Sequence, residues 1–248
     1  MKMRSLFRNV VGLSAILVAA WASALPARAE LYIIESTTAA IKAGSRLADG
    51  DSLSIPAGAQ IRAVLPSGKT QTIRGPFQGR VADLAKGTPN EGVLSWIKNI
   101  LLTGGATEAT PGAVRSISRA QPKPRMSFSW SAIPVTMDGT ICVEKGAGLQ
   151  LLRAPSSRPE RITVIDAVRS ERGEAQWEGD SETVAWPAGV TPRADAIYDL
   201  LVQGRPRRQV TLRVLAQLPA DADVLTELHK LGCKYQFEAW VRERLANK

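Results

Sequence analysis

Residues 53–81 read LSIPAGAQIRAVLPSGKTQTIRGPFQGRV, and apolar residues recur in this stretch between short turns that contain glycine or proline. Glycine supplies positive φ angles and proline fixes φ where a chain reverses direction, so this pattern is typical of short strands joined by tight turns. The stretch therefore predicts a compact β-module of about four to six short strands, packed as a small sandwich or barrel. Nothing in it indicates a particular chemistry.

The same region carries a recurring arrangement of turn residues and apolar residues. Its members are Gly44, Leu47, Gly50, Asp51, Leu53, Ile55, Pro56, Gly58, Ala59, Ile61, Ser67-Gly68 and Gly75-Pro76. With this arrangement, residues 40–80 resemble the periplasmic FecR-type β-domain, a family that includes envelope regulators which relay signals to partner proteins. The resemblance implies the fold of this module and, for function, a sensor-type role in the envelope.

The second half of the chain predicts another set of strands. Residues 126–131 alternate large apolar and small polar side chains, as a half-buried strand does. Further strand candidates are residues 140–143, 149–152, 161–165, 182–186, 197–202 and 210–215. Short strands at this spacing predict an antiparallel sandwich. With F-x-W at 128–130 and Y-x-L at 198–200, residues 125–215 are similar to bacterial immunoglobulin-like or fibronectin-like modules.

Two segments predict helices. Residues 92–102 place apolar side chains at helical spacing, and the glycines after Thr103 would end that helix. Residues 221–247 carry two apolar stripes separated at Gly232, which predicts a helical hairpin or kinked helix packed on the second sandwich. The expected fold class is therefore mainly β, with two small β-sandwich-like domains, a linking helix and a C-terminal helical segment.

The N-terminus predicts an exported protein. Residues 1–29 have a basic start, an apolar run and the small-x-small pattern Ala27-Arg28-Ala29, as a signal peptide does. A retained membrane anchor is the alternative, although we expect no membrane span in the mature chain. The protein is then periplasmic or secreted. The remaining domains expected are residues 30–104, the FecR-like β-module plus helix; residues 105–124, a linker; and residues 125–248, the β-sandwich with C-terminal helices.

The net charge argues against nucleic acid as the default partner. The whole chain has a formal net charge of +9, and residues 1–29 hold four basic and no acidic residues, so the mature chain has 9 − 4 = +5. A moderately basic exported protein is compatible with anionic lipid, lipopolysaccharide or acidic polymers, and equally with solubility alone. Composition does not choose between these partners.

The two cysteines, Cys142 and Cys233, predict one disulfide. Both would enter an oxidising compartment after export, where an even number of cysteines most simply pairs. The sequence has no C-x-x-C motif and no cluster of His and Cys, and its sole histidine is His229. We therefore expect neither a metal site nor another cofactor.

Two short motifs match parts of catalytic or nucleotide-binding patterns. Ser95 and Lys98 fit the S-x-x-K of penicillin-recognising enzymes, but S-D-N and K-T-G do not follow. The G-K-T at residues 68–70 fits the end of a P-loop, but Ala63 stands where the first glycine is required. A surface helix and a hairpin turn explain these matches, so we predict no catalytic residue.

Arg205, Arg207 and Arg208 lie at the predicted tip of a hairpin between two strands. Three guanidinium groups at such a tip could bind phosphate or carboxylate groups through paired hydrogen bonds. They are the candidate site for an anionic partner. The alternative is a solvated turn that protects the sheet edge from aggregation.

These features together predict an exported, non-catalytic envelope protein of the interaction or sensor type, which binds another protein or an anionic polymer. One alternative is a hydrolase or lyase of envelope carbohydrate, whose acidic residues the sequence does not mark. A second alternative is an accessory or assembly protein with no ligand of its own. The sequence does not indicate the oligomeric state.

Overall fold

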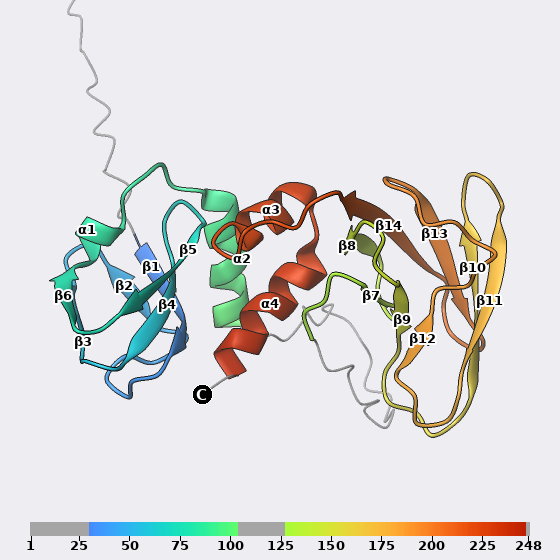
Figure 1. Ribbon diagram of the computed structural model, residues 1–248, viewed down its shortest axis with the longest axis horizontal. Helices are drawn as coiled ribbons and strands as arrows, with labels where there is room; N and C mark the ends of the chain where they lie inside the picture. Colours follow the sequence, from blue (N-terminus) through green and yellow to red (C-terminus); the bar gives the residue numbers. More distant parts are fainter. Residues whose placement is uncertain (1–29, 104–126, 247–248) are drawn as a thin grey trace, which may run out of the picture.

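The computed structural model describes residues 30–103 and 127–246. The predicted signal peptide, residues 1–29, and the predicted linker, residues 105–124, lie outside the described residues. The described part is mainly β, as the sequence predicted. Figure 1 shows one β-unit at each end of the molecule and a layer of three helices, α2, α3 and α4, between the two units.

The N-terminal unit is built from two small antiparallel sheets. The larger sheet has the strand order β2-β1-β4-β5, and the smaller sheet pairs β3 with β6. The elements are β1 (Glu30–Ser36), β2 (Arg46–Ala48), β3 (Ser52–Ile55), β4 (Gln60–Val64), β5 (Thr70–Arg74), β6 (Phe77–Arg80) and the short helix α1 (Val81–Leu84). Residues 53–81 thus form the predicted series of short strands.

The turn residues of this unit have specific structural reasons. Gly58 and Gly68 adopt φ angles of 80° and 83°, which residues other than glycine rarely adopt. A Cβ atom at Gly75 would lie 1.9 Å from the carbonyl oxygen of Pro56, so the chain between β5 and β6 can pass that carbonyl only without a side chain. Glycine therefore permits two tight turns and one close approach of backbone in this unit.

The C-terminal unit is a sandwich of a five-stranded and a three-stranded sheet. Their strand orders are β11-β10-β13-β14-β8 and β12-β9-β7. The strands are β7 (Ala132–Pro134), β8 (Gly139–Glu144), β9 (Gln150–Leu152), β10 (Glu160–Asp166), β11 (Arg172–Trp177), β12 (Thr183–Ala185), β13 (Ile197–Val202) and β14 (Arg208–Leu215). The sheets are mixed rather than purely antiparallel as expected, because β8 runs parallel to β14 and β7 runs parallel to β9.

Two strand assignments made from the sequence differ from the structure. Residues 127–131 form no strand, and β7 begins only at Ala132. Phe128 and Trp130 instead stack edge to face at 4.9 Å and pack against the helical layer. β11 was not predicted, because its inward positions hold the small residues Gly173 and Ala175 and its alternation is therefore weak.

A buried tyrosine connects the core of the sandwich to one of its loops. The Tyr198 hydroxyl donates a hydrogen bond to the Thr191 carbonyl at 2.9 Å and accepts one from the Arg193 N–H at 2.8 Å. A tyrosine that bonds to backbone a few residues upstream is typical of immunoglobulin-like sandwiches. The contact fixes the loop that enters β13.

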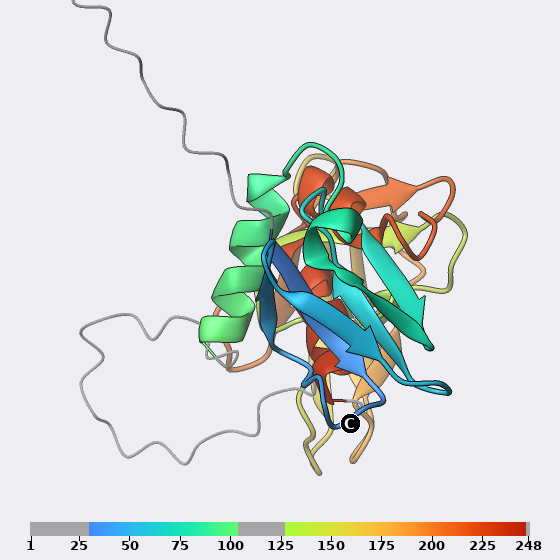
Figure 2. The same cartoon turned by 90° about the vertical axis from the view of Figure 1, so that its left-hand side faces the viewer.

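The helical layer consists of α2 (Glu91–Leu102), α3 (Val224–Leu231) and α4 (Lys234–Ala246). The Asn90 side chain caps α2 by accepting from the Val93 N–H at 3.2 Å, and Gly232 ends α3 with a φ of 76°. The sequence therefore located both helical segments correctly. Figure 2, which faces the N-terminal unit, shows α2 alongside its sheet.

The helices bury an apolar cluster against both β-units. Its buried members are Tyr32, Ile34, Val64, Val93, Leu94, Ile97, Ile100, Cys142, Val224, Leu225, Leu228, Cys233, Phe237, Trp240 and Val241. The C-terminal helices contact the sandwich at β8, as expected, but they also cover the sheet of the N-terminal unit. We call this group the interunit cluster. Within residues 30–103 and 127–246, no helix has the length and apolar character that a membrane crossing requires.

Candidate interaction surfaces

Of the predicted arginine site, Arg205 and Arg207 lie in the turn between β13 and β14 and Arg208 is the first residue of β14; all three side chains are ion-paired within the sandwich. Arg205 donates from Nη2 to both carboxylate oxygens of Glu160, at 2.6 Å and 2.8 Å. This geometry places the Arg205 guanidinium across the end of β10, where it is about three-quarters buried. Arg205 therefore connects the turn to a neighbouring strand.

The other two arginines of this turn also face acidic residues. Arg207 donates to Asp199 at 2.5 Å, and Arg208 donates to Asp138 at 2.8 Å. Partial burial opposes ionisation of Asp138, but the Gln209 backbone N–H and the Arg208 guanidinium together hold the pKa of this carboxyl below its ordinary value. Each arginine thus has a carboxylate partner, and the turn is not an uncompensated cationic patch.

The outer face of the five-stranded sheet is a second candidate surface. We use this name for the solvent-facing side chains of β10, β11 and β13 around Thr163, which lies opposite both Leu201 and Glu174 in the register. Directly paired residues of antiparallel strands lie on the same face. Leu201 is 36% exposed there, although its neighbours along β13 are buried.

Charged side chains border this aliphatic centre. Ile165 lies opposite Asp199 on one side and Arg172 on the other, and Arg172 donates to Glu174 at 2.8 Å. The outer face therefore has aliphatic and hydroxyl groups in the middle and charges of both signs around them.

A buried arginine, Arg153, organises one end of the sandwich. Its side chain is fully buried and donates to four backbone carbonyls of two loops, at 2.8 to 3.1 Å. These acceptors are the carbonyls of Ser156, Arg158, Glu178 and Ser181. Because its donors are directed at backbone carbonyls, Arg153 has a structural role at this end.

A buried carboxylate, Asp166, organises the β10–β11 turn. The backbone N–H of Arg169 contributes most to holding the pKa of Asp166 down, to about 2, and the Arg193 side chain and the Val168 N–H act in the same direction against the effect of burial. Such a carboxyl stays ionised near neutral pH and has no proton to donate. Asp166 is therefore a structural residue and unsuited to general acid catalysis.

The S-x-x-K motif on α2 does not form a catalytic pair. The Ser95 hydroxyl donates to the Gly92 carbonyl at 2.8 Å, and the Lys98 ammonium pairs with Glu30 at 3.2 Å. The G-K-T motif lies in the β4–β5 hairpin turn, with no helix after it. His229 packs edge-on against Trp96 at 4.6 Å. These residues have structural contacts that account for their positions.

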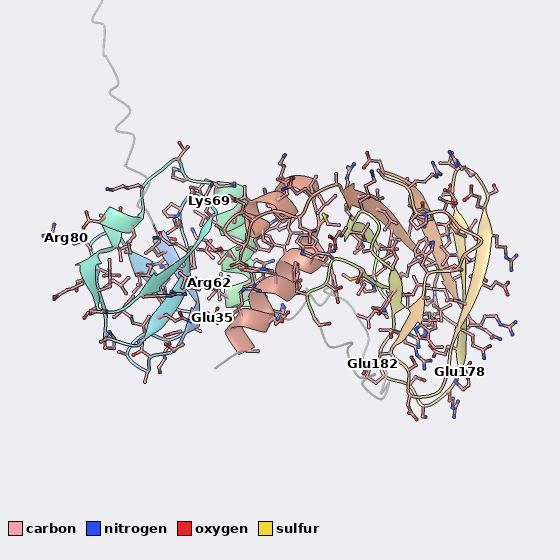
Figure 3. The ribbon with its side chains drawn as sticks, viewed as in Figure 1. Glu35, Arg62, Lys69, Arg80, Glu178 and Glu182 are labelled. Atoms are coloured by element: carbon pink, nitrogen blue, oxygen red, sulfur yellow. A yellow bond between two sulfur atoms is a disulfide. The ribbon has the colours of Figure 1, made fainter. Side chains whose placement is uncertain are left out.

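Polar contacts connect the N-terminal unit to the segment that enters α3. Arg62 on β4 forms ion pairs with Glu35 and with Asp221, and Glu35, Arg62 and Lys69 lie on the side of the unit that faces the helices (Figure 3). Lys69 pairs with Asp223 at 2.9 Å. The Thr70 N–H donates to the Ala222 carbonyl at 2.8 Å, at the edge of β5. This segment is therefore bound to the N-terminal unit.

The predicted disulfide between Cys142 and Cys233 is present. It joins β8 to the junction of α3 and α4, with 5.8 Å between the two Cα atoms. One turn further along α4, Gln236 is fully buried and bonds to the backbone of Cys142. Both side chains thus hold the same residue of β8.

A cleft with a volume of about 640 Å³ lies where β8 and β14 end. Small side chains such as Ala194 and Ala216 line it, and Glu144 is its single carboxylate. Two converging carboxylates, as a glycoside hydrolase requires, do not meet there. In the described ranges 30–103 and 127–246, no group of three or more His, Cys, Asp or Glu side chains is placed to hold a metal ion.

The sequence reasoning missed the buried polar residues Arg153, Asp166 and Gln236. A signal existed for Asp166, which continues the inward alternation of Ile162 and Val164 along β10. A polar residue at an inward position must find partners, which identifies a structural centre. Arg153 follows two buried leucines without a comparable pattern.

Comparison with known proteins gave no match for this chain among protein-family models, curated proteins or solved structures.

Proposed function

We propose that this protein is an exported, non-catalytic envelope protein whose sandwich binds another protein through the outer face of the five-stranded sheet. The observation that carries the proposal is the exposure of Leu201 beside Thr163, in the centre of the outer face. Protein interfaces commonly have such a centre of low charge and a polar rim. The alternating charges of the rim suit a partner that carries both signs of charge.

The arginine turn favours a protein partner over an anionic polymer. Arg205, Arg207 and Arg208 each face a carboxylate, of Glu160, Asp199 and Asp138 respectively, and Glu160 also pairs with the buried Arg153. A protein gains affinity for a polyanion when Lys or Arg side chains that have no other ion-pair partner neutralise its phosphate or carboxylate groups. The ion pairs would have to be broken before these arginines could contribute fully.

Two further observations support an envelope location and a sensor-type role. The disulfide is of the kind that persists in oxidising compartments, and residues 1–29 have the pattern of a secretory leader. The N-terminal unit has the short strands and tight turns that its FecR-like pattern implied. We propose a periplasmic or secreted protein in which this unit accompanies the partner-binding sandwich.

Affinity capture from the native envelope tests the proposal with matched variants. Leu201→Arg adds a bulky charge to the outer face, and Leu102→Arg makes the same change at a residue of α2 that is 86% exposed. We expect wild type and Leu102→Arg to recover the same protein in fixed stoichiometry, and Leu201→Arg to recover at least about tenfold less of it. Thr163→Arg should repeat the loss, and circular dichroism should show each variant folded.

Other outcomes would contradict the proposal. Equal recovery by Leu201→Arg and Leu102→Arg would exclude the outer face. Salt-sensitive binding of heparin, a soluble polyanion, that Arg207→Gln weakens and Leu201→Arg leaves unchanged would favour the polymer. Turnover of envelope carbohydrate that is lost when one acidic side chain is replaced would favour the hydrolase or lyase.

A further inference from the structure

The C-terminal helices share their buried core mainly with the N-terminal unit. Seven buried members of the interunit cluster come from β1, β4 and α2, and seven come from the segment 224–241, whereas Cys142 is the single buried member from the sandwich. Phe128, Trp130 and Leu215 of the C-terminal unit are only partly buried against this cluster. The C-terminal helices therefore share most of their buried core with the N-terminal unit, from which they are distant in the sequence.

The attachment of these helices to the sandwich centres on one residue. Cys142 lies on the outer side of β8, because its neighbours Ile141 and Val143 face the core of the sandwich. Its sulfur is bonded to Cys233, and its backbone N–H donates to Gln236 Oε1 at 2.9 Å. Gln236 Nε2 in turn donates to the Cys142 carbonyl.

Other contacts across this junction lie mainly along β8, which both α3 and α4 contact. Among the described residues, Tyr235 of α4 is the only helical residue buried in the core of the sandwich. The Phe128 N–H donates to Glu243 at 3.2 Å, and Gln236 Nε2 also donates to the Ser129 carbonyl at 3.2 Å. On the other side of the helices, the apolar cluster is continuous and the segment 221–223 is bound to β4 and β5.

We propose that the Cys142–Cys233 disulfide, together with Gln236, is a lock that fixes the sandwich against a body formed by the N-terminal unit and all three helices of the layer. With the disulfide absent, the sandwich moves relative to that body, and both β cores stay folded. The segment 216–220, between β14 and the bound residues 221–223, is where the chain bends. This inference rests on core membership and is independent of the partner proposed above.

Hydrogen exchange and small-angle X-ray scattering of the full chain test the lock. The double variant Cys142→Ala/Cys233→Ala should show a larger radius of gyration than the oxidised wild type. The Cys142 amide and the amides of the first turn of α4 should exchange at least about tenfold faster, because the Cys142 N–H bonds to Gln236 of α4 and not to β14. Amides of β1, β4, β10 and β13 should keep the protection they have in the wild type.

Two single variants separate the lock from nonspecific loosening. Gln236→Leu keeps the disulfide, so we expect faster exchange of the Cys142 amide with an unchanged scattering curve. Lys69→Gln removes an exposed ion pair between the N-terminal unit and Asp223. We expect Lys69→Gln to change neither measurement, because the apolar cluster still joins the helices to that unit.

Three results would overturn the inference. Scattering and exchange of the double variant identical to those of the wild type would show that the disulfide locks nothing. Loss of protection throughout β10 and β13 would show that the disulfide stabilises the fold of the sandwich itself and not its position relative to the helices. Failure of the double variant to fold would lead to the same conclusion.

Discussion

Gln236 gives Cys142 the two backbone hydrogen bonds that a neighbouring strand would otherwise provide. Its Oε1 accepts from the Cys142 N–H at 2.9 Å, and its Nε2 donates to the Cys142 carbonyl. β8 is the last strand of its sheet, so its outward backbone groups at this point need partners from outside the sheet. A side chain of α4 thus completes a sheet edge.

Replacement of this side chain should be costly. Gln236→Leu leaves a buried N–H and a buried carbonyl without partners, at about 1–3 kcal/mol for each group, so we expect the free energy of unfolding to fall by about 2–6 kcal/mol. Urea titration measures this loss. Gln78→Leu, at an exposed position of β6, is the matched control and should stay within about 0.5 kcal/mol of wild type. Equal stability of the two variants would contradict the assigned role.

Replacement of Arg153 tests whether the geometry of its guanidinium, rather than its positive charge, holds the loops of the sandwich. Arg153→Lys keeps the positive charge but cannot direct fixed donors at four carbonyls. We expect the variant to lose about 2–4 kcal/mol of stability in thermal or urea unfolding. Arg161→Lys, on an exposed position of the adjoining strand, should change little. A fully stable Arg153→Lys protein would show that charge alone is sufficient.

The lowered pKa of Asp166 predicts a loss of folded-state stability at acidic pH. Its pKa is about 2 in the folded protein, below the ordinary value of about 3.9, so its contribution is complete above about pH 4 and is lost as the pH falls through 2. The melting temperature of wild type should therefore fall more between about pH 4 and pH 2 than that of Asp166→Asn. Asp180→Asn, at an exposed carboxyl, should follow wild type. Parallel curves for wild type and Asp166→Asn would contradict this assignment.

The contact between α2 and α3 depends on the absence of a side chain at Gly92. A Cβ atom there would lie 2.3 Å from Cε1 of His229. We expect Gly92→Ala to destabilise wild type by about 1–2 kcal/mol, since the overlap outweighs the better helix propensity of alanine. In a His229→Ala background the same change should be neutral or stabilising. A double-mutant cycle measures this coupling, and additive effects would contradict it.

Local periodicity was sufficient to locate much of the fold. Strands β10 and β14 and helix α2 were predicted because their buried residues recur at the period of the element, and β8 and β13 were predicted as short apolar runs between turns. Residues 127–131 alternate similarly, but Phe128 and Trp130 pack on each other and on helices rather than across a sheet. An alternating pattern identifies which side chains are buried without identifying what covers them.

The same reason limited the prediction of the candidate sites. The disulfide was predicted from the number of cysteines and their expected compartment, and Arg205 and Arg207 lie between two strands as predicted, whereas Arg208 begins β14. The carboxylate partner of Arg208 is Asp138, 70 residues away, and pairing over such a distance leaves no local pattern. For the same reason, the helices were expected on the sandwich alone, although the interunit cluster also includes Tyr32 and Ile34 of β1.

Site-specific photo-crosslinking in the native envelope tests the central claim most directly. A benzophenone side chain placed at position 201, on the outer face, should join the protein to one discrete partner protein. The same group at position 102, which is more exposed on α2, should not form that product. No product from position 201, or the same product from both positions, would contradict binding through the outer face of the sandwich.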